Sequence, residues 1–160
     1  MHGFITFGGL GICFVAIMLF IWIGSNALKS LDANDILDGV DCMIITTRKL
    51  YKGYGYSGVS NDSIISMGNI PDKWTTEGRK SLQLEGCDVN IGPKTGETDG
   101  KNFVVEVSNI SKSLCKRIVK DYNNSLKDTT YKNVKLIINY DPEATSCSNS
   151  NYNVLQFETK

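Results

Sequence analysis

The chain has 160 residues and a mass of 17.7 kDa, which is room for one domain and not comfortably for two. Its 17 basic and 17 acidic side chains cancel, so we expect no broad electrostatic binding to nucleic acid, and its 41% hydrophobic content excludes a wholly disordered chain. The charge is unevenly spread, because residues 1–28 contain no Asp, Glu, Lys or Arg. The sequence therefore divides into an apolar stem and a polar head.

The stem is the apolar run FITFGGLGICFVAIMLFIWI at 4–23. About twenty apolar residues in a helix match a hydrocarbon core of roughly 30 Å, and a helix satisfies its own backbone inside lipid. A cleaved secretory signal is the alternative, but it has a basic start, and Met1-His2-Gly3 carries no Lys or Arg. These features favour a retained transmembrane helix over 4–23.

Glycines in and after the stem are typical of a helix that packs closely against copies of itself, although glycine is common in membrane helices in general. The candidate positions for close packing or local unwinding are Gly8, Gly9, Gly11 and Gly24.

Residues 24–52 have the pattern of an amphipathic helix. The apolar residues that recur at a spacing near 3.6 are Ile36, Leu37, Val40, Met43, Ile44, Leu50 and Tyr51. Acidic residues come early and basic residues late, in agreement with the helix dipole, and glycines from Gly53 onward end the segment. The simplest interpretation is one helix over 1–52, with its regular part from 4, whose second half packs on the head.

The head, residues 53–160, has the pattern of an α+β domain. We predict a short helix over 60–67, strands near 82–91, 103–107, 134–140 and 152–157, and an amphipathic helix over 111–126. This order predicts an antiparallel sheet of about four strands packed on the long helix, with a second helix beside it.

No catalytic motif is recognisable in the sequence. No GxGxxG follows a strand, GxSxG and HExxH do not occur, and the only histidine, His2, precedes the stem. Loop carboxylates such as Asp141 and Glu143 are usually solvated rather than paired for acid–base chemistry. We therefore expect a protein that is not an enzyme, with no catalytic residue, no metal site and no cofactor.

Four cysteines follow the stem: Cys42, Cys87, Cys115 and Cys147. Without metal-type spacing in a small domain, they indicate two disulfides and an oxidising compartment, with four free thiols as the alternative. Sequence alone allows three connectivities. We expect the head to lie outside the cytoplasm.

Taken in order, these segments resemble a type IV pilin, and most of all the type IVb branch with its thin pili encoded by conjugative plasmids. Beyond the stem that continues as an amphipathic helix, the passages that carry the resemblance are GYSGVSNDSIISMGNIPDKW (55–74), LQLEGCDVNIG (82–92), FVVEVSNISKSLCKRIV (103–119) and CSNSNYNVLQF (147–157). Together they cover nearly the whole chain.

The resemblance implies a type IV pilin fold and a structural subunit that polymerises into a helical filament of identical copies. It implies insertion into the inner membrane of a Gram-negative bacterium, leader removal by a prepilin peptidase with Gly3–Phe4 as the candidate cleavage position, and export by the pilus assembly machinery. The filament would serve adhesion, aggregation or conjugative mating contact with a host or recipient cell. The stem residues that would form its core are Phe4, Phe7, Leu10, Phe14, Ile17, Phe20 and Ile21.

The resemblance also implies a disulfide between Cys115 and Cys147 that frames a surface-exposed region. Cys42 and Cys87 would then pair with each other and staple the sheet to the long helix.

One position departs from the family pattern. Most type IV pilins carry an acid at the fifth mature residue, but here that residue is Ile5 if the mature chain starts at Met1, and Gly8 if cleavage follows Gly3. A minor or tip pilin and a type II secretion pseudopilin are therefore kept as alternatives to a main subunit. A single-pass membrane-anchored periplasmic binding module is the further alternative.

Overall fold

The computed structural model describes residues 32–68, 70–96, 100–125, 131 and 133–159. Residues 32–50 are helical, and we name them the spine helix. The elements after it are α2 (Asn61–Met67), the short 3₁₀ helices η1 (Asp72–Trp74) and η2 (Glu77–Arg79), β1 (Leu82–Leu84), β2 (Cys87–Pro93), β3 (Phe103–Ile110), α3 (Lys112–Ser125), β4 (Val134–Ile138) and β5 (Asn153–Thr159). The α+β class predicted from the sequence is confirmed.

The strands form one sheet in the order β1-β2-β3-β5-β4, and every neighbouring pair is antiparallel. The sheet has five strands rather than about four, because the single strand predicted over 82–91 is a hairpin. Its turn consists of Glu85 and Gly86, both with positive φ (48° and 78°), so Leu84 pairs directly with Cys87. A two-residue turn of this kind suits the twist of a hairpin, and the alternating residues on each side conceal it in the sequence.

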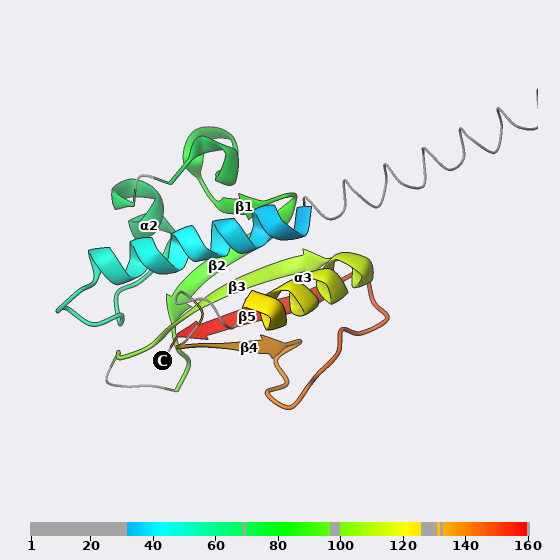
Figure 1. Ribbon diagram of the computed structural model, residues 1–160. Helices are drawn as coiled ribbons and strands as arrows, with labels where there is room; N and C mark the ends of the chain where they lie inside the picture. The colour runs from blue at the N-terminus through cyan, green and yellow to red at the C-terminus, as the bar shows by residue number, and fades with distance from the viewer. Residues whose placement is uncertain (1–31, 69, 97–99, 126–130, 132, 160) are drawn as a thin grey trace, which may run out of the picture.

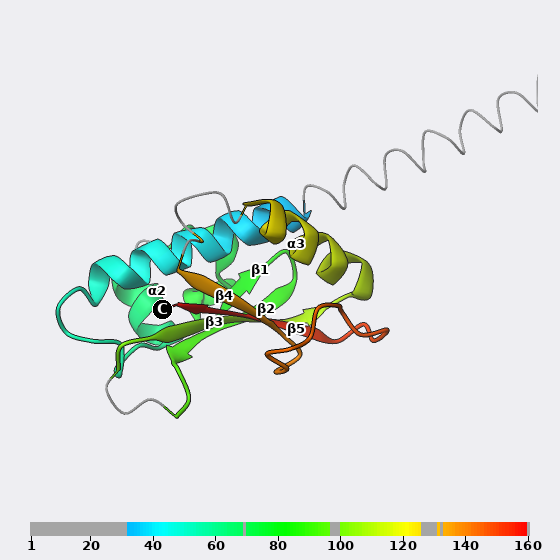
Figure 2. The ribbon, with the colours of Figure 1, turned by 60° about the horizontal axis from the view of Figure 1, so that its bottom comes forward.

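The spine helix and α3 lie on the same face of the sheet, which gives two layers (Figures 1 and 2). On strands β2, β3 and β5 the residues that point toward these helices are buried, and those between them are more exposed. The outer face is largely polar and carries its own contacts, such as the hydrogen bond from Gln156 Nε2 to Glu106 Oε2 (2.8 Å) and the Lys94–Glu158 ion pair (2.8 Å). The core therefore lies between the helices and one face of the sheet.

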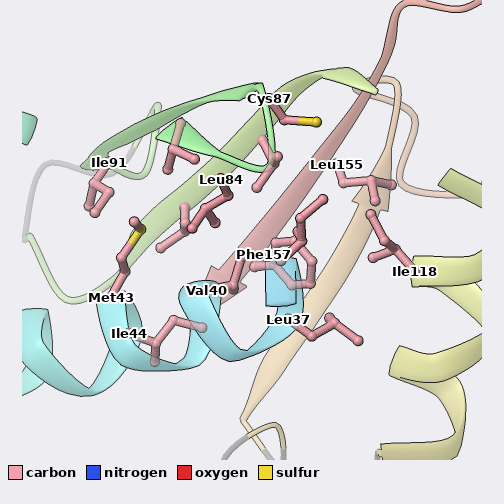
Figure 3. Close-up of a cluster of buried hydrophobic side chains, with 14 of the residues drawn as sticks. Leu37, Val40, Met43, Ile44, Leu84, Cys87, Ile91, Ile118, Leu155 and Phe157 are labelled. Atoms are coloured by element: carbon pink, nitrogen blue, oxygen red, sulfur yellow. The ribbon is translucent and has the colours of Figure 1, made fainter. Parts of the chain in front are cut away.

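The spine helix contributes one apolar stripe to this core (Figure 3). The stripe consists of Ala33, Ile36, Leu37, Val40, Met43 and Ile44, each less than a tenth exposed. Gly39 allows a close approach to the sheet, since a Cβ there would stand 2.3 Å from Leu84 Cδ2. The helical spacing in the sequence thus predicts this face from Ile36 to Ile44. Toward the end of the helix the prediction is less exact, because Leu50 and Tyr51 are only partly buried, the helix ends at 50 rather than 52, and Thr47 is fully buried.

The remaining boundaries agree with the sequence within a few residues, and two shifts have a clear cause. Strand β3 continues beyond 107 to Ile110, because a bulge near Asn109 (φ 61°) restores its pairing with β5. Strand β4 ends at Ile138 rather than 140, because Asn139 and Tyr140 both adopt positive φ and turn the chain. Helix α2 begins after Ser60, whose side chain caps it, and ends at Gly68 as expected.

Candidate functional site

The stem lies outside the described residues, and with it every site residue that was predicted there: Gly3, Phe4, Phe7, Gly8, Gly9, Leu10, Gly11, Phe14, Ile17, Phe20, Ile21 and Gly24. Within the part of the chain that the structure describes, no helix combines the length and the apolar character needed to cross a bilayer. The surfaces available for a functional argument are therefore those of the head and the spine helix.

A disulfide joins α3 to the segment that follows β4. Cys115 lies one turn into α3, Cys147 lies near the end of the loop before β5, and their Cα atoms are 6.1 Å apart. The bond spans a sequence separation of 32 residues, for which the chain-entropy model gives about 3–4 kcal/mol of stabilisation. This is the pairing that the pilin resemblance implies.

The bond ties residues 139–152, which we name the disulfide-closed loop, to α3. This loop is otherwise organised by one buried amide, Asn153. Its Oδ1 accepts hydrogen bonds from the Ser148 backbone (2.8 Å) and hydroxyl (3.0 Å), while its Nδ2 donates to the Ser150 carbonyl (2.8 Å). The Asn139 side chain donates to the same Oδ1 (3.1 Å) and accepts from the Val154 N–H (2.8 Å). Sequence reasoning missed both asparagines, because nothing local marks an amide that serves a loop.

Cys42 and Cys87 are free thiols, so the predicted bond between them is wrong. Met43 and Ile44 take the face of the spine helix that packs on the sheet, which leaves Cys42 on a partly buried flank. Cys87 belongs to the core instead, at the other end of the cluster from Met43 (Figure 3). Burial first, then the carboxylates of Asp88, Glu85 and Asp32, raise the pKa of the Cys87 thiol to about 11.

Two buried tyrosines join elements of the second half of the head, and one of them also attaches it to the spine helix. The Tyr131 hydroxyl donates to the Leu37 carbonyl of the spine helix (3.1 Å), and the Tyr122 hydroxyl of α3 donates to the Val134 carbonyl of β4 (2.8 Å). The rings of both tyrosines contact Phe157 of β5. Burial raises the pKa of Tyr131, an effect that nearby Asp41 reinforces, so its hydroxyl stays protonated and able to donate.

The turn-rich stretch after the spine helix is fixed by polar side chains that reach the core elements. Asn61 bridges α2 to β2: its Nδ2 donates to the Val89 carbonyl (2.9 Å) and its Oδ1 accepts from the Ile91 N–H (2.7 Å). Arg79 donates to the carbonyls of Ile65 and Ile70 (both 3.2 Å) and pairs with Asp72 (2.8 Å). These contacts satisfy backbone groups that no strand or helix covers, so the stretch is ordered without a sheet of its own.

The geometry is that of a helix laid across an antiparallel sheet, an ordered turn-rich stretch on one side of it and a disulfide-closed loop on the other. A search of curated proteins finds no match for the chain. The sequence model of one family, described as PilS N terminal, matches residues 30–159 and so spans the spine helix and the whole head. The chain therefore belongs to the PilS N-terminal family of type IV pilins, of the IVb kind, and is a pilin-type structural subunit of a type IV pilus.

Proposed function

We propose that this chain is the main polymerising subunit of a thin, IVb-like pilus, and that the filament makes adhesive or mating contact with other cells. The observation that carries this proposal is the seating of the spine helix, whose apolar stripe is buried in the head from Ala33 onward. A pulling force on the N-terminal part of the chain is then transmitted directly into the core of the head, because the helix from residue 32 to 50 leaves no flexible linker between them. Such a coupling suits a subunit that is held by its stem.

The apolar residues 4–23 supply the force for polymerisation in this proposal. Before assembly they hold the subunit in the inner membrane, where a prepilin peptidase and the assembly machinery act on it. In the filament, each Å² of apolar surface that the stems bury against one another contributes roughly 25 cal/mol of stabilisation. The role is structural, and we propose no reaction catalysed by the chain.

The compact head favours a main subunit over a minor or tip pilin, because it carries no additional domain beyond the pilin fold among the described residues. The stem without an acid at the fifth position favours the minor role. The abundance of the chain in isolated filaments separates these two candidates.

The test is electron microscopy of sheared surface fractions from cells that encode the pilus. We compare the wild type, an in-frame deletion of the chain, and the deletion complemented in trans. The proposal predicts filaments in the first and third strains only, with this chain as their most abundant protein by mass spectrometry. Filaments that persist in the deletion strain, or a chain that stays entirely in the membrane fraction, would contradict it.

A further inference from the structure

The outward face of α3 is basic. Between Lys112 and Ser125 the helix carries four bases and one acid, Asp121. Its buried residues Cys115, Ile118 and Tyr122 face the core, whereas Lys116 and Lys120 are exposed. A shallow depression on this face is lined by Ser113, Lys116, Arg117, Lys120 and Asp121. We name this surface the basic face.

A groove adjoins the basic face, between α3 and the end of the disulfide-closed loop. Lys116 and Lys120 form part of its wall, together with Val119, Thr145 and Cys147. A second depression continues from Val119 toward Leu136 of β4. Val119 and Leu136 are apolar side chains at the margin of the core, only partly buried. An apolar floor beside lysines suits an acidic loop of a protein better than a small ion.

An acidic surface lies on the opposite edge of the sheet. Glu85 and Asp88 are exposed at the β1–β2 turn, and residues 82–92 contain no base. The described part of the spine helix begins at Asp32, and this end of the helix lies beside the β1–β2 turn (Figure 1). We name these three residues the acidic turn.

The two surfaces lie at opposite edges of the sheet but at the same end of it. β1 is the first strand in the order, while α3 contacts β5 and shares a groove with β4, the last strand. Five strands place the two edges about 19 Å apart. Asp88 pairs with Ser108, just before β3 leads into α3, so the acidic turn and the first turns of α3 lie at one level (Figure 1).

We propose that the basic face and groove of one head bind the acidic turn of a neighbouring copy of the same chain. The inference rests on the filament assembly proposed above and names the contact between heads. Two copies set side by side, with little shift along the spine helix, bring the surfaces together. The contact joins two different surfaces, so it repeats without closing and builds a filament rather than a dimer. A net charge of zero agrees with this self-complementarity.

Charge reversal with rescue tests the contact in cells that assemble the pilus. Lys116→Glu/Lys120→Glu is expected to lower the yield of sheared filaments about tenfold or more, because it replaces attraction by repulsion at every repeat. Glu85→Lys/Asp88→Lys is expected to have the same effect, and the four changes together are expected to restore most of the yield. Lys52→Glu/Lys80→Glu, the same charge change at exposed lysines outside both surfaces, is the matched control and should leave the yield unchanged. Subunit level and the Cys115–Cys147 bond are measured in each strain to exclude misfolding.

A cross-link separates failure of this contact from failure of the filament proposal. In intact cells, oxidation of Glu85→Cys/Lys120→Cys is expected to give a ladder of cross-linked copies, while each single variant and Lys49→Cys/Lys120→Cys give none. The same ladder in the membrane fraction without any filaments would keep the contact and refute the pilus proposal. Normal filaments without the ladder would overturn the contact. So would normal filaments of the Lys116→Glu/Lys120→Glu variant that lose retention on immobilised heparin, because the basic face would then serve a polyanion.

Discussion

Apolar side chains fill the interface between the spine helix and strands β1–β3, whereas the loop 139–152 on the other side of the head is almost entirely exposed. In the spine helix, residues such as Ile36, Val40 and Met43 are fully buried. In the loop, Cys147 is the only buried side chain, and it is the one that forms the disulfide with Cys115. One region is held by burial, and the other by a covalent bond and the amide of Asn153. The loop can therefore change its surface residues without changing the core, which suits the part of a filament subunit that faces outward.

The largest expected effect comes from removing a fully buried ring of the core, Phe157 of β5. Phe157→Ala leaves a cavity under Tyr122 and Tyr131, and it should lower the free energy of unfolding by about 3–5 kcal/mol. Tyr152→Ala, at a side chain that is 77% exposed, is the control and should change it by less than about 0.5 kcal/mol. Denaturant unfolding of the purified full chain in detergent measures both. Equal effects of the two substitutions would show that Phe157 is not a core residue.

Removal of the disulfide should sharpen the contrast between the two regions. Cys115→Ala/Cys147→Ala is expected to cost about 3–4 kcal/mol and to lower the subunit yield. Hydrogen exchange should accelerate most in 139–152 and least in β2 and β3, because burial holds these strands without the bond. Cys42→Ala, which removes a free thiol, is the matched control. A uniform acceleration over the whole head would contradict the division.

Asn153→Ala removes the side-chain hydrogen bonds that hold the loop and keeps the Cys115–Cys147 disulfide. The amide contacts both the loop and the Ile110 carbonyl at the end of β3 (3.3 Å), so its loss should cost about 1–3 kcal/mol. Asn151→Ala, at an exposed position in the same loop, should be nearly neutral. Thermal unfolding compares the two, and the disulfide should still form in both. An Asn153→Ala variant as stable as wild type would show that the bond alone holds the loop.

The smallest expected effect concerns the reactivity of the two free thiols, Cys42 and Cys87. With a pKa raised to about 11, the Cys87 thiol should resist iodoacetamide at pH 8, while the partly buried Cys42 reacts and is identified by peptide mapping. Because the pKa in the folded state lies above the usual 9.0, stability should fall as the pH rises from about 9 toward about 11. Cys87→Ala should remove part of that slope. Rapid labelling of Cys87 in the native protein would contradict its place in the core.

The sequence predicts the features that repeat along the chain and misses those that depend on a single distant contact. Helical spacing predicts the buried face of the spine helix and of α3, because buried residues such as Ile36, Val40 and Ile118 have other apolar residues three or four positions away. The Glu85-Gly86 turn is concealed because the alternation of the two flanking strands runs through it. Asn61 and Asn153 act on backbone groups many residues away, and no local pattern distinguishes them from surface amides. The error at Cys42 and Cys87 has the same origin, because pairing depends on which way a side chain leaves its helix.

The central claim is that copies of this chain form the shaft of the pilus, with the stems inside and the heads outside. Cryo-electron microscopy of sheared filaments tests it most directly. We predict a shaft of this one subunit in which helical density continues from residue 50 back into a central bundle, the disulfide-closed loop faces outward and the basic face meets the acidic turn of a neighbour. A shaft built from another protein, with this chain confined to the tip or to the membrane, would contradict the claim.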